Sequence, residues 1–177
     1  MSTKQLETFM QRTISSFGLI ALTIAATSPA WALSPEDIVG TWKMLSTVRQ
    51  LEGSDKIINN LGEHPNGIMI ITPDHRFIII ETGDGRKAAS TTEEFAALQK
   101  SELAYSGLVT FSPDPANAQG LKMITKVDIA WNEEWTGTSQ MRFLSLGGNR
   151  LTIRTPLYKN PITGEMATST VVFERTK

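Results

Sequence analysis

Few side chains in this 177-residue chain combine a titratable group with the spacing that acid–base or metal chemistry requires. The two histidines, His64 and His75, stand beside turns and lack the spacing of a metal-binding pair, so we expect no metal site. His64 follows Glu63, whose carboxylate would raise the pKa of the imidazole, and the two could form an acid–base pair. A solvent-exposed turn histidine is the simpler interpretation, and we favour it.

Charged residues also flank the tryptophans near residue 130. Glu133 and Glu134 lie between Trp131 and Trp135, and paired carboxylates can exchange protons when their environments separate their pKa values. Adjacent turn residues usually point apart into water, and we favour that interpretation. Arg142 could instead hold a ligand carboxylate through two hydrogen bonds. The strand pattern around Arg142 leaves an inward and an outward orientation equally open.

A larger group of apolar and aromatic side chains could line a ligand pocket. Tyr105 or Arg142 would then supply the polar contact to the ligand. The alternative is that these side chains fill the interior of the domain. If the fold is an eight-stranded barrel, as the strand pattern described below predicts, its interior can be packed solid or hold one small ligand. We assign no catalytic residue and no cofactor. The expected lining residues are Trp42, Met44, Phe77, Tyr105, Met123, Thr125, Val127, Trp131 and Arg142.

The first strand of the predicted fold begins at Gly40. Ser34 followed by Pro35 and two acids is a helix-start pattern, so a short helical turn should run from Pro35 to Val39. After it, residues alternate in polarity with the period of a half-buried strand. We expect Trp42, Met44, Ser46 and Val48 on the buried face and Thr41, Lys43, Thr47 and Arg49 on the outer face, with Leu45 interrupting the pattern.

A hairpin and a helix follow. Strands at 67–72 and 76–82 flank a tight turn at 73–75, and they are apolar on both faces. The capping box of Thr91 and Glu94 predicts a helix from about Thr92 to Ala104. We expect this helix to cover the outer apolar face of the hairpin.

The second half of the chain is a succession of short strands and turns. The segment 121–131 has the clearest pattern, which places Met123, Thr125, Val127, Ile129 and Trp131 on one face. Further strands are expected at 108–111, 138–146, 151–155 and 166–175. The chain is therefore predicted to be all-β, a closed antiparallel barrel of eight to ten strands with one α-helix, since closure removes exposed sheet edges.

The N-terminal segment reads as an export signal. Lys4 and Arg12 precede an apolar run at 14–26, and Ala30-Trp31-Ala32 fits a signal peptidase site. We expect a signal peptide at 1–32, a barrel domain at 33–177, and a periplasmic or secreted protein. The alternative is a retained membrane anchor, but the run is shorter than the ~20 residues that a membrane span requires. Membrane insertion of the processed protein is therefore not expected.

The charge of the chain argues against nucleic acid as a partner. The formal net charge is −1, and removing residues 1–32, with Lys4, Arg12 and Glu7, makes it −2. No basic stripe or polybasic cluster is present. The chain contains no cysteine, so disulfides cannot stabilise the domain and burial of the core must do so.

Four segments, in this order and spacing, resemble the bacterial and fungal lipocalin-like domain family. The resemblance covers nearly all of residues 33–177. It implies an eight- to ten-stranded barrel around a small apolar cavity, and some members belong to polyketide or secondary-metabolite pathways. The segments are Ile38-Val39-Gly40-Thr41-Trp42, Gly62 to Gly67 with the turn at Thr72-Pro73-Asp74, Ala104-Tyr105-Ser106-Gly107, and Trp135-Thr136-Gly137-Thr138 with Arg142-Phe143 and Leu151-Thr152-Ile153.

The glycine-x-tryptophan at residues 40–42 resembles the lipocalin signature, in which a late arginine packs over the tryptophan. Arg175 is the candidate here, which makes Gly40, Trp42 and Arg175 the expected structural residues. The chain departs from the family pattern at Ile71, where an aromatic is common, and at His75, where glycine is usual. A histidine often seen in the strand before the Trp-x-Gly turn is also missing, since Thr125 and Lys126 stand there.

These observations lead to three functional hypotheses. The first is an exported, non-enzymatic barrel that binds or carries a small hydrophobic molecule. The second is a cofactor-free cyclase or isomerase acting on a small hydrophobic, polyketide-like substrate, which needs a titratable group facing the cavity: His64, Glu63, Asp128 or Arg142. The third is a partner-binding module that uses the apolar hairpin at 68–80 as its interface.

Overall fold

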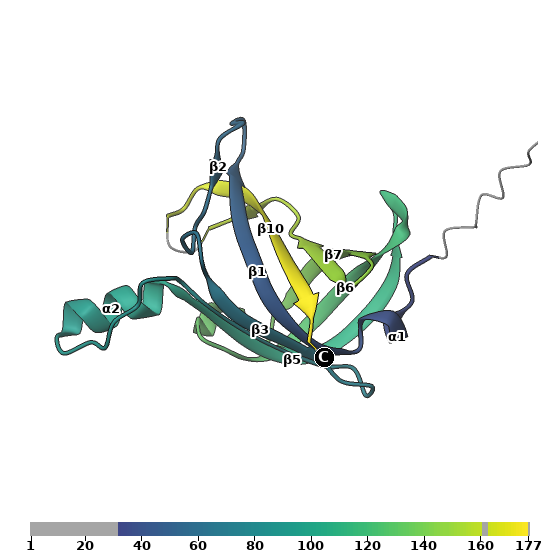
Figure 1. Ribbon diagram of the computed structural model, residues 1–177, viewed down its shortest axis with the longest axis horizontal. Helices are drawn as coiled ribbons and strands as arrows, with labels where there is room; N and C mark the ends of the chain where they lie inside the picture. The colour runs from purple at the N-terminus through teal and green to yellow at the C-terminus, as the bar shows by residue number, and fades with distance from the viewer. Residues whose placement is uncertain (1–31, 161–162, 177) are drawn as a thin grey trace, which may run out of the picture.

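Strand β1 pairs with both β3 and β10, and this double pairing closes the sheet into a barrel (Figure 1). The computed structural model describes residues 32–160 and 163–176, so the predicted signal peptide lies outside the described residues except for Ala32. The sheet order is β2-β1-β3-β4-β5-β6-β7-β8-β10-β9, and every pairing is antiparallel. Eight strands form the barrel wall. The other two, β2 and β9, are only two residues long and pair with β1 and β10, respectively. The predicted fold class is confirmed.

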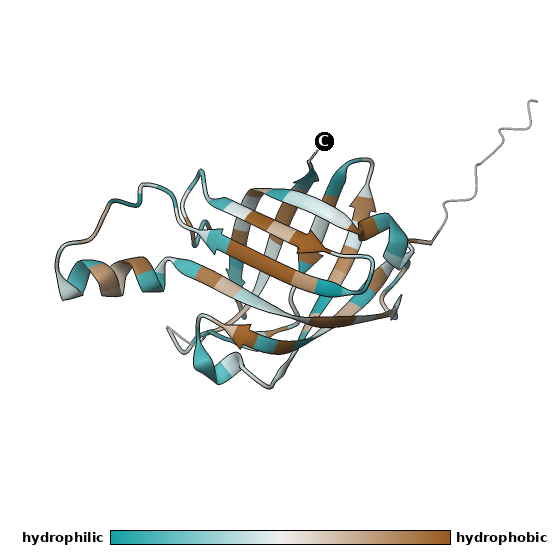
Figure 2. Ribbon diagram, turned by 90° about the horizontal axis from the view of Figure 1, so that it is seen from below, coloured by the Kyte–Doolittle hydropathy of each residue, from teal (hydrophilic) through white to brown (hydrophobic). Residues whose placement is uncertain are grey.

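The elements alternate short turns with long strands. Figure 2 shows hydrophobic and hydrophilic residues alternating along several wall strands, as expected for a sheet with one buried face. The bounds are α1 Pro35–Ile38, β1 Gly40–Leu51, β2 Ile57–Ile58, β3 Asn66–Ile71, β4 Arg76–Thr82, α2 Thr92–Lys100, β5 Glu102–Asp114, β6 Asn117–Ala130, the 3₁₀ turn η1 Glu133–Trp135, β7 Ser139–Gly147, β8 Arg150–Arg154, β9 Tyr158–Lys159 and β10 Met166–Arg175.

The turn α1 and the side chain of Trp42 close one end of the barrel. The Ser34 backbone N–H donates to the Asp37 carboxylate at 2.9 Å, which fixes the start of α1. The Trp42 indole is fully buried, and its N–H donates to the Ile38 carbonyl oxygen at 2.9 Å. The core of the barrel contains other fully buried side chains, which include Met69, Ile71, Met123, Leu144, Leu151 and Phe173.

A β-bulge in β1 reverses the face on which its later residues lie. The register with β10 shifts between Met44 and Ser46, which leaves Leu45 without a partner. Thr47 therefore points inward and is only 3% exposed, and Arg49 also faces the interior. The prediction that Ser46 and Val48 occupy the buried face, with Thr47 and Arg49 outside, was wrong because one extra residue shifts the alternation.

A second bulge lies between β5 and β6. Ser106 pairs with Ile129 and Gly107 with Val127, so Asp128 is the extra residue. A Cβ on Gly107 would lie 2.1 Å from the Lys126 carbonyl oxygen, which explains the glycine in this close strand contact. The side chain of Ile129 is 70% exposed, so the prediction that it shares the face of Val127 was wrong.

The helix α2 begins at Thr92 as predicted but ends at Lys100, because β5 starts at Glu102. Its capping box is formed, with the Glu94 backbone N–H donating to the Thr91 hydroxyl at 3.2 Å. No side chain of α2 is buried, and Phe95 is 60% exposed. Figure 1 shows α2 projecting away from the barrel wall. None of the helices in the described ranges is long and apolar enough to cross a lipid bilayer.

The outer face of the β3–β4 hairpin remains uncovered. Ile68, Ile78 and Ile80 are exposed there, so the prediction that α2 covers this face was wrong. The turn between the two strands is made by His75, whose φ of 65° lies in the left-handed region. The His75 ring packs edge-to-face on Phe111 at 5.6 Å, which gives this exposed histidine a structural contact.

Candidate ligand-binding cavity

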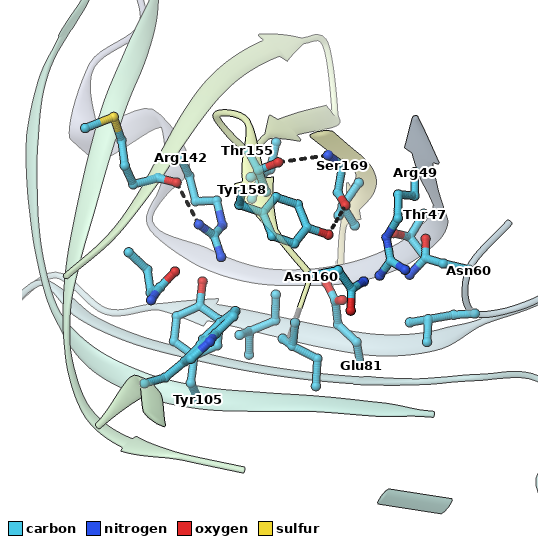
Figure 3. Close-up of a pocket in the computed structure, with 18 of the residues that line it drawn as sticks. Thr47, Arg49, Asn60, Glu81, Tyr105, Arg142, Thr155, Tyr158, Asn160 and Ser169 are labelled. Atoms are coloured by element: carbon cyan, nitrogen blue, oxygen red, sulfur yellow. Dashed lines mark hydrogen bonds between the residues drawn. The ribbon is translucent and has the colours of Figure 1, made fainter. Parts of the chain in front are cut away.

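The barrel contains a cavity of about 560 Å³ whose lining does not include Trp42, and Figure 3 shows part of that lining. Its apolar wall comes from inward residues of β4, β6, β8 and β10, which are Phe77, Ile79, Met123, Ile153, Val171 and Phe173. Lys100 and Lys159, both exposed, lie at its rim. A cavity of this size falls within the roughly 300–1,000 Å³ typical of small-molecule sites.

A chain of aromatic rings forms one wall of the cavity. Phe77 and Tyr105 have ring centres 5.1 Å apart, Tyr105 and Trp135 5.3 Å apart, and Trp135 and Trp131 5.0 Å apart. The turn η1 positions the two indoles, since the Asn132 side chain accepts a hydrogen bond from the Glu134 backbone N–H at 3.2 Å. These contacts hold a rigid apolar surface toward a ligand.

Arg142 on β7 points into the cavity. Its guanidinium carbon lies 5.9 Å from the ring centres of both Tyr105 and Trp135. One guanidinium N–H donates to the Met141 carbonyl oxygen at 2.7 Å. Burial raises the pKa of the Tyr105 hydroxyl, and Arg142 opposes this rise. Of the two orientations that the sequence leaves open, the inward one is found.

Glu81 is a buried carboxyl group in the same wall. It follows Phe77 and Ile79 at alternate positions of β4, so all three face inward. Its side chain is 5% exposed, and burial raises its pKa to about 7, against the opposing effect of Arg142. Sequence reasoning missed Glu81, although its phase with Phe77 and Ile79 was a usable signal.

Polar residues gather at the end of the cavity where β1, β2 and β9 meet. Figure 3 shows Thr47, Arg49, Asn60, Tyr158, Asn160 and Ser169 around this end. The Tyr158 and Ser169 hydroxyl groups are hydrogen-bonded at 2.9 Å, and the Ser169 backbone N–H donates to the Thr155 hydroxyl at 2.8 Å. The β1 bulge brings Thr47 and Arg49 here, and sequence reasoning placed both outside.

The other charged candidates lie away from the cavity lining. Glu63 and His64 are exposed, and their backbone N–H groups donate to the Asp84 carboxylate at 2.8 and 3.1 Å. Asp128 accepts a hydrogen bond from the Ser106 hydroxyl at 2.6 Å and pairs with Arg76 on the outer surface. Its pKa is lowered by these two partners, the Ser106 hydrogen bond first. The side chains of Glu133 and Glu134 are also exposed.

The residues expected to line a pocket divide into two groups. Five lie on the cavity wall: Phe77, Tyr105, Met123, Trp131 and Arg142. The other four, Trp42, Met44, Thr125 and Val127, are buried in the packed interior but do not line the cavity. Arg175 lies over Trp42 at the closed end, with its guanidinium carbon 4.1 Å from the ring centre.

A family model described as a lipocalin-like domain matches residues 39–176. The match spans the glycine-x-tryptophan segment at its start and Arg175 at its end. No curated protein matches the chain.

Proposed function

The chain belongs to the lipocalin-like domain family, and on this premise we propose that it binds or carries a small hydrophobic molecule in its barrel cavity. The observation that carries the proposal is the cavity of about 560 Å³ with its aromatic wall. An apolar ligand is stabilised there by about 25 cal/mol for each Å² of apolar surface removed from water.

Polar groups in the cavity would orient such a ligand. Tyr105 and Arg142 lie in contact within the aromatic wall, so a ligand ring or chain on this wall has a hydroxyl and a guanidinium within reach. A few polar groups in a mainly apolar pocket typically supply orientation and specificity, while the apolar wall supplies most of the affinity.

Export is part of the proposal. Cleavage after Ala32 would leave Leu33 at the new N-terminus. Leu33 is buried, and its backbone N–H donates to the Gln119 carbonyl oxygen at 3.3 Å. The proposed cleavage therefore leaves Leu33, a residue of the packed core, in the processed protein. The test is to determine the N-terminal residue of the protein recovered from the expressing cell, which should be Leu33. A protein that still carries residues 1–32 would contradict export by this signal.

Fluorescence titration tests the binding proposal, because Trp131 and Trp135 line the cavity. We expect saturable changes in tryptophan emission with apolar probes such as fatty acids and aromatic metabolites. Ile79→Phe adds volume inside the cavity and should weaken binding by about tenfold, which is about 1.4 kcal/mol. Ile78→Phe adds the same volume on the outer face and should leave binding unchanged. No saturable change with any probe would refute the proposal.

A second function, cofactor-free isomerisation or cyclisation, is favoured by Glu81. A general base works best when its pKa lies near the working pH, and burial places that of Glu81 at about 7. Tyr105 and Arg142 could polarise a substrate carbonyl oxygen beside it. The test is exchange of the α-hydrogens of a bound ketone in D₂O, which Glu81→Gln should abolish while binding persists. A ketone that binds without exchange above the buffer rate would contradict this function.

A further inference from the structure

Arg49 brings a second guanidinium group into the cavity, and it differs from Arg142 in its partners. Arg142 is engaged by two aromatic rings and by the Met141 carbonyl oxygen. The Nε atom of Arg49 is buried and has no hydrogen-bond partner within the described part of the chain. Leaving a buried donor of a charged group unpaired is unfavourable, and an acceptor on a ligand would remove that cost.

No carboxylate forms an ion pair with Arg49 among the described residues. The two ion pairs found in these ranges join Arg76 to Asp128 and Arg86 to Glu102. Asn60 also lies at this end, and its buried Oδ1 atom likewise has no partner in the residues described. This end of the cavity thus combines the Arg49 cation with neutral polar groups and with the buried carboxyl group of Glu81, to which Arg49 forms no ion pair.

The charge of the lining has the opposite sign to that of the chain. Four basic residues line the cavity, Arg49, Lys100, Arg142 and Lys159, against the two acids Glu81 and Glu102. The chain as a whole has a formal net charge of −1. Glu102 is already paired with Arg86. Figure 3 shows Glu81 beside Asn160 on the side of Arg49, but no ion pair joins Glu81 to Arg49 among the described residues, and burial raises the pKa of Glu81 to about 7. An anion is therefore favoured inside this barrel.

We propose that the cavity contains an anion site at Arg49, and that the ligand is an amphipathic carboxylic acid whose acidic group binds there. This inference rests on the proposed binding function and adds the chemical class of the ligand. The two carboxylate oxygens accept two parallel hydrogen bonds from the planar Arg49 guanidinium, the arrangement that arginine and carboxylate groups favour. The apolar part of the ligand extends along Ile79 and the ring of Tyr105 toward Trp135.

Matched ligands separate this site from the general binding function. Decanoic acid and decanol share a chain and differ in the acidic group, so their affinities at neutral pH are compared by tryptophan fluorescence. Wild type should bind decanoate at least about tenfold more tightly than decanol. Arg49→Gln should lose that preference by weakening decanoate alone, since a tenfold loss corresponds to one charge-assisted hydrogen bond. Arg154→Gln removes an exposed arginine from β8 and should change neither affinity.

Each outcome has one meaning. If neither ligand binds wild type, the binding function itself fails. If both bind with equal affinity, the binding function stands and the anion site is wrong. If Arg142→Gln abolishes the preference while Arg49→Gln retains it, the acid binds at Arg142 and the assignment to Arg49 is overturned. Arg49→Lys keeps the charge but lacks the planar guanidinium, so it should show a weaker preference for decanoate over decanol than wild type does. This variant replaces Arg49→Gln in the test if Arg49→Gln does not fold, and an unchanged preference would argue against the guanidinium site.

Discussion

The guanidinium carbon of Arg175 lies 4.1 Å from the centre of the Trp42 indole ring, and this contact joins the two ends of the folded chain. The same guanidinium donates to the carbonyl oxygens of Val39, at 2.7 Å, and of Asp37. The last strand thus caps the turn α1 that closes the barrel. Cation–π contact and hydrogen bonding act together at this position.

Replacing Arg175 by lysine should destabilise the protein although it keeps the charge. Lysine cannot stack a planar group on the indole and reach two carbonyl oxygens at once. We expect the free energy of unfolding to fall by about 1–3 kcal/mol. Urea denaturation measures it. Arg150→Lys, at an exposed position of β8, is the control and should have no measurable effect. Equal stability of wild type and Arg175→Lys would show that the stacking contributes nothing.

Gly40→Ala should disturb the same contact from the other side. Gly40 has φ of +134°, which side chains rarely adopt, and a Cβ there would lie 2.8 Å from a guanidinium nitrogen of Arg175. Backbone strain alone costs on the order of 1–3 kcal/mol, and displacement of Arg175 adds to it. Thermal unfolding should show a lower midpoint than for Gly147→Ala, because a Cβ at Gly147 meets no atom within 4 Å. Equal midpoints for the two variants would argue against this account.

Glu81 should make stability depend on pH. Burial raises its pKa from 4.5 to about 7 in the folded protein, so the folded state binds a proton more tightly than the unfolded chain does. Stability from this group is therefore complete below pH 4.5 and is lost as the pH rises through about 7. The full penalty above that pH is on the order of 3 kcal/mol.

Glu81→Gln removes this dependence and serves as its test. Measured by urea unfolding across the pH range, the variant should gain stability relative to wild type as the pH rises through the Glu81 pKa of about 7. Glu165→Gln changes an exposed carboxyl group and should follow wild type at every pH. A difference between Glu81→Gln and wild type that does not change with pH would contradict the effect of burial.

The bulge between β5 and β6 can be tested with two truncations. Val127→Ala removes methyl groups from a side chain that is 2% exposed and should cost about 1–3 kcal/mol. Ile129→Ala removes more atoms from a side chain that is 70% exposed and should stay within about 0.5 kcal/mol of wild type. Simple alternation predicts comparable losses at the two positions, so equal destabilisation would contradict the observed register.

The barrel and its closed end were accessible from the sequence because their signals are local. Gly40 and Trp42 mark the first strand, and the phase of Arg175 with Val171 and Phe173 identifies its inward face. The capping box at Thr91 likewise located the start of α2. Where α2 lies relative to the barrel depends on contacts distant in sequence, which the capping box does not specify.

The polar half of the cavity was not accessible in the same way. Alternation identifies an inner face by its apolar residues, so it could have placed Glu81, which is in phase with Phe77 and Ile79. The inward-facing Thr47 and Arg49 are polar residues, and the bulge sets them out of phase with the apolar Met44 that precedes it. At the bulge, neither Ser46 nor Thr47 is apolar, so the sequence offers no sign that the faces exchange. The fold could therefore be predicted more completely than the ligand-facing surface that it carries.

The unpaired residue Leu45 has an evolutionary consequence. A chain that lost this one position would lose the bulge and keep Ser46 opposite Val172, so Thr47 and Arg49 would still face inward. A chain that kept Leu45 but paired it with Val172 would instead shift every later residue of β1 by one place, which would turn Ser46, Val48 and Gln50 inward and expose Thr47 and Arg49 to solvent. A change of register alone could thus replace the interior cation by a neutral lining in a relative of identical sequence length, and aligned identity in this strand would not reveal it.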